Sequence, residues 1–376
     1  MAKRAIFEDV AQADKPMAKG GVIDAARRGS RAAARVWLVI LFALVVVMIA
    51  VGGLTRLTDS GLSITEWKPV TGALPPMSAE AWAAEFDLYR QIPEYQLQNK
   101  GMTLSEFQFI YWWEWGHRQL GRVIGLVWAL GFFGLLVTRK MPVGWTGRFL
   151  ALGLLGGAQG AIGWWMVSSG LQGGMLDVAS YRLATHLGLA FVILGLIAWF
   201  TLSMSRPEAA LLQARRDRHG GLMTWGTVLL GLTFLQVLIG ALVAGIDAGR
   251  NYIDWPLMAG GLTPPGMWDL QPAWRNLFEN DGTVQFFHRL TGYLLFAVIL
   301  AAWWRARRSA YRATQGAFAA VLGMAVLQMV LGIVTVMNSS PWHLAILHQL
   351  GAVALLVLVV RARHRAKYPL SQSVRG

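Results

Sequence analysis

Residues 184–203 read ATHLGLAFVILGLIAWFTLS, twenty consecutive residues without an aspartate, glutamate, lysine or arginine. About 20 apolar residues in a helix are enough to cross the hydrocarbon core of a bilayer. A second stretch, residues 343–360 (HLAILHQLGAVALLVLVV), has the same character. Each stretch carries a histidine inside the apolar run, His186 and His348. The two stretches therefore predict membrane-spanning helices that each hold one buried polar ring.

The rest of the chain extends this pattern. Of its 376 residues, 55% are hydrophobic and 14% are charged, whereas soluble domains carry about 25% charged residues. Since the chain has no cysteine, disulfides, iron–sulfur clusters and thiolate haem ligation are excluded. We predict an all-α integral membrane protein with eight transmembrane helices, over residues 36–54, 119–138, 148–167, 184–203, 222–245, 287–304, 315–337 and 343–360.

The predicted membrane topology accounts for the net charge of +14, because the basic residues gather in segments on one side of the membrane. Of the 34 lysines and arginines, 24 lie in alternate segments, which are residues 1–35, 139–148, 204–221, 305–314 and 361–376. Basic segments stay on the cytoplasmic side, so both termini are expected there and nucleic-acid binding is not needed to explain the charge. His219 and His364 fall in these segments and are expected to be solvated.

Two long loops, 55–116 and 246–286, lie on the opposite side. Loops of this length in compact proteins are usually functional, and we expect them to cover the outer helix ends as lids. Trp82, Phe86 and Tyr89 indicate an amphipathic stretch in the first loop. The alternative is that the loop aromatics form an interfacial belt.

The chain also repeats itself. HRQLGRVIGL (117–126) corresponds to HRLTGYLLF (288–296), and THLGLAFVIL (185–194) corresponds to LHQLGAVALL (347–356). A duplicated unit of four helices keeps its orientation, which is a parallel repeat. The pattern predicts two pseudo-symmetric four-helix bundles in this order: a basic tail (1–35), the first bundle (36–203), a linker (204–221), the second bundle (222–361) and a second tail (362–376).

Each repeat places two histidines at the outer ends of its second and fourth helices. They are His117 and His186 in the first repeat, and His288 and His348 in the second. A single such histidine would more often make an interhelical hydrogen bond, but four in register indicate function. Zinc and di-iron sites lack their usual ligands here. Two facing imidazoles suit the axial positions of a haem iron, so we predict one haem in each bundle.

Neighbouring residues fit a flat ring. Arg118 and Arg289 directly follow two of the histidines and could pair with haem propionates, or reach the headgroups instead. Small residues would let the ring approach the helices, although close helix packing is the alternative; they are Gly116, Gly121, Gly125, Gly188, Gly292 and Gly351.

The two repeats differ at one position. Glu114 lies three residues before His117, and Gln285 lies three residues before His288. A carboxylate can move a proton or orient a water, whereas an amide can only hydrogen-bond. This asymmetry predicts chemistry at the first site and a redox cofactor at the second. In the alternative interpretation Glu114 only forms an exposed pair with Arg118.

Residues 36–361 resemble haem A synthase, a family of cytochrome oxidase assembly enzymes, in its cysteine-free alphaproteobacterial and mitochondrial branch. The resemblance rests on these stretches: RLTDSGLSITEWKPVTGALPP (56–76), EFQFIYWWEWGHRQLGR (106–122), THLGLAF (185–191), GALVAGIDAGRNYIDWPLM (240–258), FFHRLTGY (286–293) and LHQLGA (347–352).

The resemblance implies an oxidoreductase of the bacterial inner membrane that oxidises a methyl group of haem O to the formyl group of haem A. His117 and His186 would bind the substrate haem O, His288 and His348 a resident haem b, and Glu114 would be catalytic. The haem sites would lie towards the periplasm. Either an axial histidine leaves the iron, or oxidation proceeds by electron transfer and capture of a carbocation by water.

The resemblance also implies partners: haem O synthase upstream, cytochrome oxidase assembly factors, an unidentified electron donor and the lipid bilayer. The resemblance leaves open whether the protein forms a homo-oligomer. Two other functions fit the paired histidines without the resemblance, namely a di-haem b-type cytochrome that exchanges electrons with quinone and a haem transporter or chaperone. The carboxylate at Glu114 argues against the cytochrome, because pure electron transfer does not need it.

Overall fold

The computed structural model describes residues 22–171, 173 and 175–371, and this part of the chain is helical, without a strand. Eight of its helices are long and apolar enough to cross a membrane, which confirms the predicted fold class. They are α1 (Val22–Leu57), α4 (Leu104–Val137), α5 (Thr146–Gly170), α6 (Ser180–Met204), α8 (Gly220–Gly245), α10 (Asp281–Ala306), α11 (Arg312–Met337) and α12 (Trp342–Lys367).

Shorter segments lie in the connections. The described part of the first long loop contains η1 (Thr71–Ala73), α2 (Ala79–Tyr89) and α3 (Pro93–Leu97). The second long loop contains η2 (Ala248–Arg250), η3 (Ala273–Arg275) and α9 (Asn276–Glu279), and the linker after α6 contains α7 (Glu208–Arg216).

Each of the eight predicted ranges falls on an observed helix, but two helices begin much earlier than predicted. α1 begins at Val22 instead of residue 36, and α4 begins at Leu104 instead of residue 119. α4 starts there because of a capping box: the Thr103 hydroxyl accepts from the Glu106 N–H, and the Glu106 carboxylate accepts from the Thr103 N–H at 2.7 Å. His117 therefore lies in the interior of α4, and its predicted place at the helix end is wrong.

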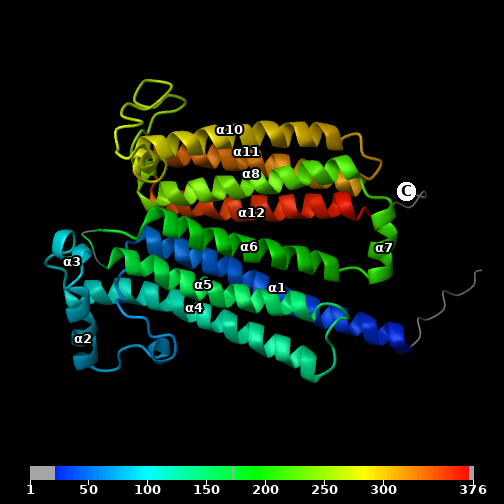
Figure 1. Ribbon diagram of the computed structural model, residues 1–376, viewed down its shortest axis with the longest axis horizontal. Helices are drawn as coiled ribbons and strands as arrows, with labels where there is room; N and C mark the ends of the chain where they lie inside the picture. The colour runs from blue at the N-terminus through cyan, green and yellow to red at the C-terminus, as the bar shows by residue number, and fades with distance from the viewer. Residues whose placement is uncertain (1–21, 172, 174, 372–376) are drawn as a thin grey trace, which may run out of the picture.

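The long helices pack as two groups of four that lie side by side (Figure 1). In the first group, α1 contacts α4 and α6, and α5 contacts the same two helices. In the second group, α8 contacts α10 and α12, and α11 contacts the same two helices. α6 and α1 join the groups through contacts with α8 and α12.

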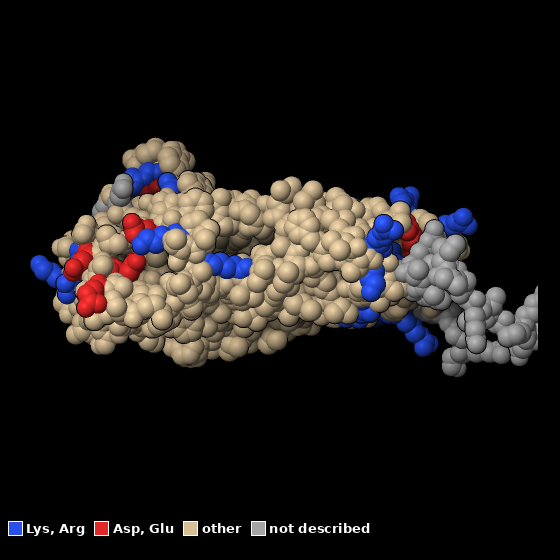
Figure 2. Space-filling model, turned by 90° about the horizontal axis from the view of Figure 1, so that it is seen from below, with Lys and Arg blue, Asp and Glu red and all other residues tan. Residues whose placement is uncertain are grey.

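The ends of the molecule differ in composition. The long loops, with α2 and α3, lie at one end, and α7 and the C-terminal end of α12 lie at the other (Figure 1). In the view of Figure 2, lysine and arginine gather at both ends, acidic residues gather mainly at the loop end, and the belt between them is mostly uncharged. This distribution suits a molecule whose middle faces lipid.

The first long loop has its own apolar core. α2 is capped by Ser78, whose side chain accepts from the Ala81 N–H, and it buries Phe86 and Tyr89. The Phe86 ring stacks on Phe107 of α4 with ring centroids 4.8 Å apart. The predicted amphipathic stretch is thus confirmed, and it fixes the loop to the end of α4.

One expected surface residue is buried. His219 is exposed as predicted, but the His364 side chain is only 2% exposed and lies against the rings of Trp199 and Tyr368. The prediction of a solvated His364 is wrong because α12 does not stop at residue 360. It continues to Lys367 and keeps His364 on the helix face that contacts α6.

Candidate functional site

The four predicted histidines lie in two pairs, one in each group of helices. His288 of α10 and His348 of α12 face each other, with ring centroids 6.4 Å apart and ring planes at 78°. His117 of α4 and His186 of α6 lie on the second and fourth long helices of the first group, as His288 and His348 do in the second. All four rings are half-buried.

The spacing of the second pair fits a metal ion between the rings. A metal held by one nitrogen of each imidazole at about 2 Å needs ring centroids roughly 6 Å apart, and the observed value is 6.4 Å. In the described ranges, no group of three or more histidine, cysteine, aspartate or glutamate side chains could hold a metal ion. Two facing imidazoles, as in the second pair, would suit an iron whose other ligands come from a macrocycle.

Each imidazole lies directly on a glycine of a neighbouring helix. A Cβ at Gly163 of α5 would lie 2.8 Å from the His186 ring. A Cβ at Gly52 of α1, Gly240 of α8 or Gly332 of α11 would lie 3.0 Å from the rings of His117, His288 and His348, respectively. Atoms this close repel, so any larger residue at these glycines would displace the imidazole. The sequence analysis did not single out these glycines as ring contacts.

Two of the six predicted small residues support close helix packing. A Cβ at Gly116 or Gly125 would meet no atom within 4 Å, and Gly125 is exposed, so these two positions do not decide between the interpretations. Gly188 instead packs on Leu238, and Gly351 packs on Gln328, as close helix packing requires. A Cβ at Gly121 would lie 3.5 Å from Met48, and a Cβ at Gly292 would lie 3.3 Å from Gln236.

Three glutamines contact the histidines from adjacent helices. Gln159 donates to the carbonyl of His186 at 2.9 Å, and its amide nitrogen lies 3.2 Å from Nδ1 of the ring. Gln236 makes the same two contacts with His288, at 2.9 and 3.2 Å. Gln328 donates to the carbonyl of His348 at 2.7 Å. These glutamines hold the histidines in place, and the sequence analysis did not predict their contacts.

Glu114 connects the first site to the first long loop. Its side chain is 2% exposed. One carboxylate oxygen accepts from Ser63 Oγ at 2.8 Å and from the Ile64 N–H at 2.7 Å, and the other accepts from Arg118 Nη2 at 2.6 Å. The pair with Arg118 is therefore formed, but the alternative of an exposed pair is wrong because the loop covers it.

Gln285 occupies the matching place in the second group. Its amide donates to the carbonyls of Ala248 and Asn251 at 2.7 and 2.8 Å, and its oxygen accepts from Arg289 at 2.9 Å. The carboxylate of Glu114 accepts from its loop, whereas the amide of Gln285 donates to its loop. Both residues fasten a loop to the helix that carries a histidine.

The two arginines are also bonded to the loops. Arg118 donates to the carbonyls of Ile64 and Glu66 at 2.8 and 3.0 Å. Arg289 donates to loop carbonyls at 2.7 to 2.9 Å; the acceptors are Tyr252, Asp254 and Leu257. Arg118 also lines a cavity of about 290 Å³ between the loop and α4. Both guanidinium groups hold the loops over the sites.

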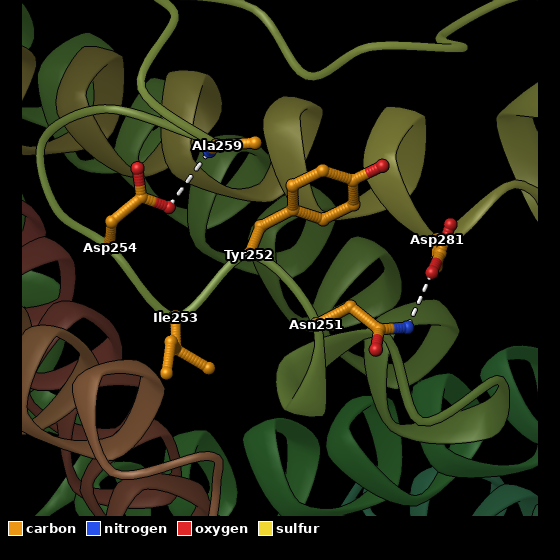
Figure 3. A pocket seen from close by; sticks show the side chains of 6 residues that line it. All are labelled: Asn251, Tyr252, Ile253, Asp254, Ala259 and Asp281. Carbon is orange, nitrogen blue, oxygen red and sulfur yellow. Dashed lines mark hydrogen bonds between the residues drawn. The ribbon is translucent and has the colours of Figure 1, made fainter.

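Two further features lie outside the histidine pairs. His343, five residues before His348, is exposed at the first turn of α12. An open pocket in the second long loop is lined by polar and apolar side chains, and Asn251 donates to Asp281 across it at 2.5 Å (Figure 3). Neither feature includes one of the four paired histidines.

Known proteins resemble this chain over its whole length. Residues 35–360 match the family described as cytochrome oxidase assembly protein, COX15-CtaA. The heme A synthase of Dinoroseobacter shibae is 68% identical over 100% of this chain and 98% of the relative. The heme A synthase of Ruegeria sp. TM1040 is 61% identical over 100% of both chains. That of Paracoccus denitrificans is 59% identical over 100% of this chain and 99% of the relative.

Proposed function

The chain belongs to the cytochrome oxidase assembly family COX15-CtaA. From this membership we propose which haem each of its two histidine pairs binds. Its activity is that of a haem A synthase: the protein is an oxidoreductase that converts haem O to haem A. The different roles that we propose for the two histidine pairs are argued from the contacts of each site.

His117 and His186 bind the substrate haem O, and His288 and His348 bind a resident haem b. The facing rings of the second pair, 6.4 Å apart, carry the proposal that the histidines are axial ligands. Both ligands of the second pair are held by glutamines, which suits a permanent cofactor. Haem b, when bound, supplies electron transfer.

Arg118 and Arg289 position the loops over the haems. A guanidinium has five N–H donors, and four are engaged in each arginine, by Glu114, Ile64 and Glu66 for Arg118. One N–H of each guanidinium is left for a haem propionate. Each arginine thereby connects the loop, the helix and the edge of the haem.

Glu114 is the proton-handling group of the first site. It lies on α4 three residues before His117, a spacing that puts both side chains on one helical face. A buried carboxylate can take up the protons that leave the substrate methyl group as it is oxidised. The second site has Gln285 at the matching position. Its amide cannot take up a proton, so we place the oxidation of the substrate at the first site only.

The two groups of helices are copies of one parallel repeat. The glycine contacts support this, because the first and third long helices of each group supply the glycines, and the second and fourth supply the histidines. The bias of lysine and arginine towards alternate segments supports cytoplasmic termini and a periplasmic loop end, for a protein of the bacterial inner membrane. Haem O synthase is the upstream partner, and an electron donor acts on the enzyme.

The function is tested in a host that makes haem O and lacks its own haem A synthase. Expression of the full chain should yield haem A in extracted membranes, identified by its mass and by its pyridine haemochrome spectrum. A wild-type chain that accumulates in the membrane and yields only haem O would refute the activity. The same extraction from the purified protein should contain haem b.

A further inference from the structure

A cavity of about 290 Å³ lies between the first long loop, α2 and α4, and none of the four paired histidines lines it. Its walls combine apolar side chains, such as Ile64 and Pro75, with aromatic rings, three cations and one carboxylate. Small-molecule pockets are typically roughly 300–1,000 Å³ and are mainly apolar with a few polar groups. The volume and the lining therefore fit a ligand with a single ring.

Two polar groups of α4 that line the cavity lack hydrogen-bond partners. Tyr111 is 5% exposed, and its hydroxyl makes no hydrogen bond with any residue in the described ranges. Trp115 follows one helical turn later, and its buried Nε1 has no partner either. Trp82 of α2 fixes the tyrosine ring through an edge contact, with ring centroids 4.9 Å apart. Because a buried donor without an acceptor is destabilising, both groups favour a ligand that offers acceptors.

The charges around the cavity are balanced. Lys68 pairs with Glu66 at 2.6 Å and with Glu85 at 3.1 Å, and Arg118 pairs with Glu114 at 2.6 Å. One more arginine completes the three cations of the lining, so three positive charges lie beside three carboxylates. An anion would find no excess of positive charge here, and a neutral ligand is favoured.

That arginine, Arg122, holds the loop against α4. Its guanidinium donates to the carbonyls of Lys68 and Pro69 at 2.9 and 3.0 Å, and to Gln119 at 2.8 Å. Three of its five N–H groups are thereby engaged, and two are left for a ligand. Gln119 in turn donates to the carbonyl of Ala73 at 2.5 Å. The loop therefore turns back along the apolar part of α4 (Figure 1).

The returning loop carries exposed apolar side chains. Val70, Leu74 and Met77 are 81, 75 and 82% exposed, and Leu74 also lines the cavity. Apolar side chains beside a membrane-spanning helix are stable in contact with lipid. A ligand that is dissolved in the lipid can thus reach the cavity at this rim.

The second group of helices does not repeat these unpaired donors. Gly282 and Phe286 stand 171 positions after Tyr111 and Trp115, the same offset that relates His288 to His117. The tryptophan of the second loop is paired, because Trp255 Nε1 donates to the Tyr293 hydroxyl at 2.9 Å. The cavity donors are therefore a property of the first repeat and not of the shared helix packing.

We propose that this cavity binds the head group of a membrane quinone. A quinone is neutral, flat and soluble in lipid, and its two carbonyl oxygens accept hydrogen bonds. The Tyr111 hydroxyl donates to one carbonyl, and a free N–H of Arg122 donates to the other. The rings of Tyr111 and Trp115 supply the apolar wall. This binding goes beyond the proposed function and does not depend on which histidine pair holds the substrate.

The test is photolabelling of the purified full-length protein, in nanodiscs of phosphatidylcholine, with an azido-substituted ubiquinone. The wild type should be labelled within residues 64–85 or 111–122, and ubiquinone-1 should displace the label. Y111F removes one hydrogen bond and should raise the ubiquinone-1 concentration that displaces half of the label by roughly 2–10-fold.

A second variant fills the cavity. A81F adds a ring at a residue of the lining and should abolish the displaceable label. A84F adds the same ring on the exposed face of α2 and is the matched control, which should bind as the wild type does. Y111F decides the outcome if A81F does not fold.

The proposal is overturned if ubiquinone-1 does not displace the label from the wild type, or if Y111F binds as the wild type does. Displacement by phosphatidylglycerol and not by ubiquinone-1 would assign the cavity to an anionic lipid and would also overturn it. Haem A formation by the same chain tests the proposed function separately. A chain that forms haem A but binds no ubiquinone-1 refutes only this inference, and the converse result refutes only the proposed function.

Discussion

The ring of His288 lies 6.4 Å from the ring of His348, and each rests on a glycine of another helix, Gly240 and Gly332. All four helices of the second group thus contribute to one site: two supply an imidazole and two supply the surface on which it lies. The first group uses its four helices in the same way. The orientation of each ring is therefore determined by helix packing as well as by its own rotamer.

The glycine contacts predict a steric effect on haem binding. G163A should lower the haem O content of the purified protein at least fivefold and leave haem b unchanged, because its methyl group would lie 2.8 Å from the His186 ring. G332A should lower haem b instead. The haem content per protein is measured by pyridine haemochrome spectra.

Two glycines on the same helices serve as controls for these variants. G160A and G323A add a methyl group with no atom within 4 Å and should retain both haems. Equal haem contents in G163A and G160A would show that the contact does not position the ring.

Replacement of Glu114 tests proton handling. E114Q should fold, retain haem b and bind haem O, yet form about 10²–10⁴-fold less haem A, because the amide cannot take up a proton. The hydroxymethyl intermediate should accumulate if Glu114 acts in the second oxidation. Both products are separated by chromatography of extracted haems.

The matched control for E114Q is S63A. It removes one hydrogen bond between the loop and Glu114 and keeps the carboxylate. If Glu114 only anchors the loop, E114Q and S63A should lose activity to similar degrees and no intermediate should accumulate. A normal haem A yield in E114Q would refute the proton-handling role.

The arrangement of the helices could be predicted from the sequence because membrane-spanning helices are long and continuously apolar. All eight were located, and the four histidines were assigned to the correct helices. The early start of α4 was missed because its first two turns are amphipathic and covered by α2, and only the Thr103–Glu106 capping box marks the helix end. His364 was missed because its burial depends on contacts with α6, which the local sequence does not show.

Of the candidate site, the sequence predicted the four histidines but not the residues that contact them. Histidines in register can be found in a repeat, but the contacts that support them come from other helices and depend on packing. The Gln236–His288 and Gly240–His288 contacts join residues about fifty positions apart.

An ion cluster around the largely covered Arg56 joins the two groups at the loop end. Arg56 of α1 contacts Asp59 at 3.0 Å, Asp177 before α6 at 3.4 Å and Asp247 after α8 at 3.2 Å. R56A would remove three ion pairs at once and should lower the free energy of unfolding by roughly 1–2 kcal/mol, because solvent screens pairs whose aspartates are 37–42% exposed. The control R90A breaks an exposed pair with Asp87 and should cost about 0–1 kcal/mol. Equal melting temperatures in detergent for the two variants would contradict the bridging role.

Glu94 in the first loop predicts a pH dependence of stability. Burial, and then the charges of Asp177, Asp59 and Glu114, raises the pKa of Glu94 from 4.5 to about 8. The native state therefore holds a proton that the unfolded state releases between pH 4.5 and about pH 8, so stability falls as the pH rises through this interval.

E94Q removes this titration. Its melting temperature should depend less on pH between 5 and 8 than that of the wild type, and it should exceed the wild-type value at pH 9, because glutamine carries no charge to desolvate. The scan is made on the full-length protein in detergent. Parallel pH profiles for the two proteins would show that Glu94 does not titrate in this interval.

The most direct test of the site division is the haem content of four purified histidine variants. H288A and H348A should lose haem b, because each removes an axial ligand of the resident haem. H117A and H186A should retain haem b, lose bound haem O and form no haem A. H343A should retain both haems, since this residue is exposed at the start of α12. Loss of haem b from H117A or H186A, with haem b retained in H288A and H348A, would contradict the account.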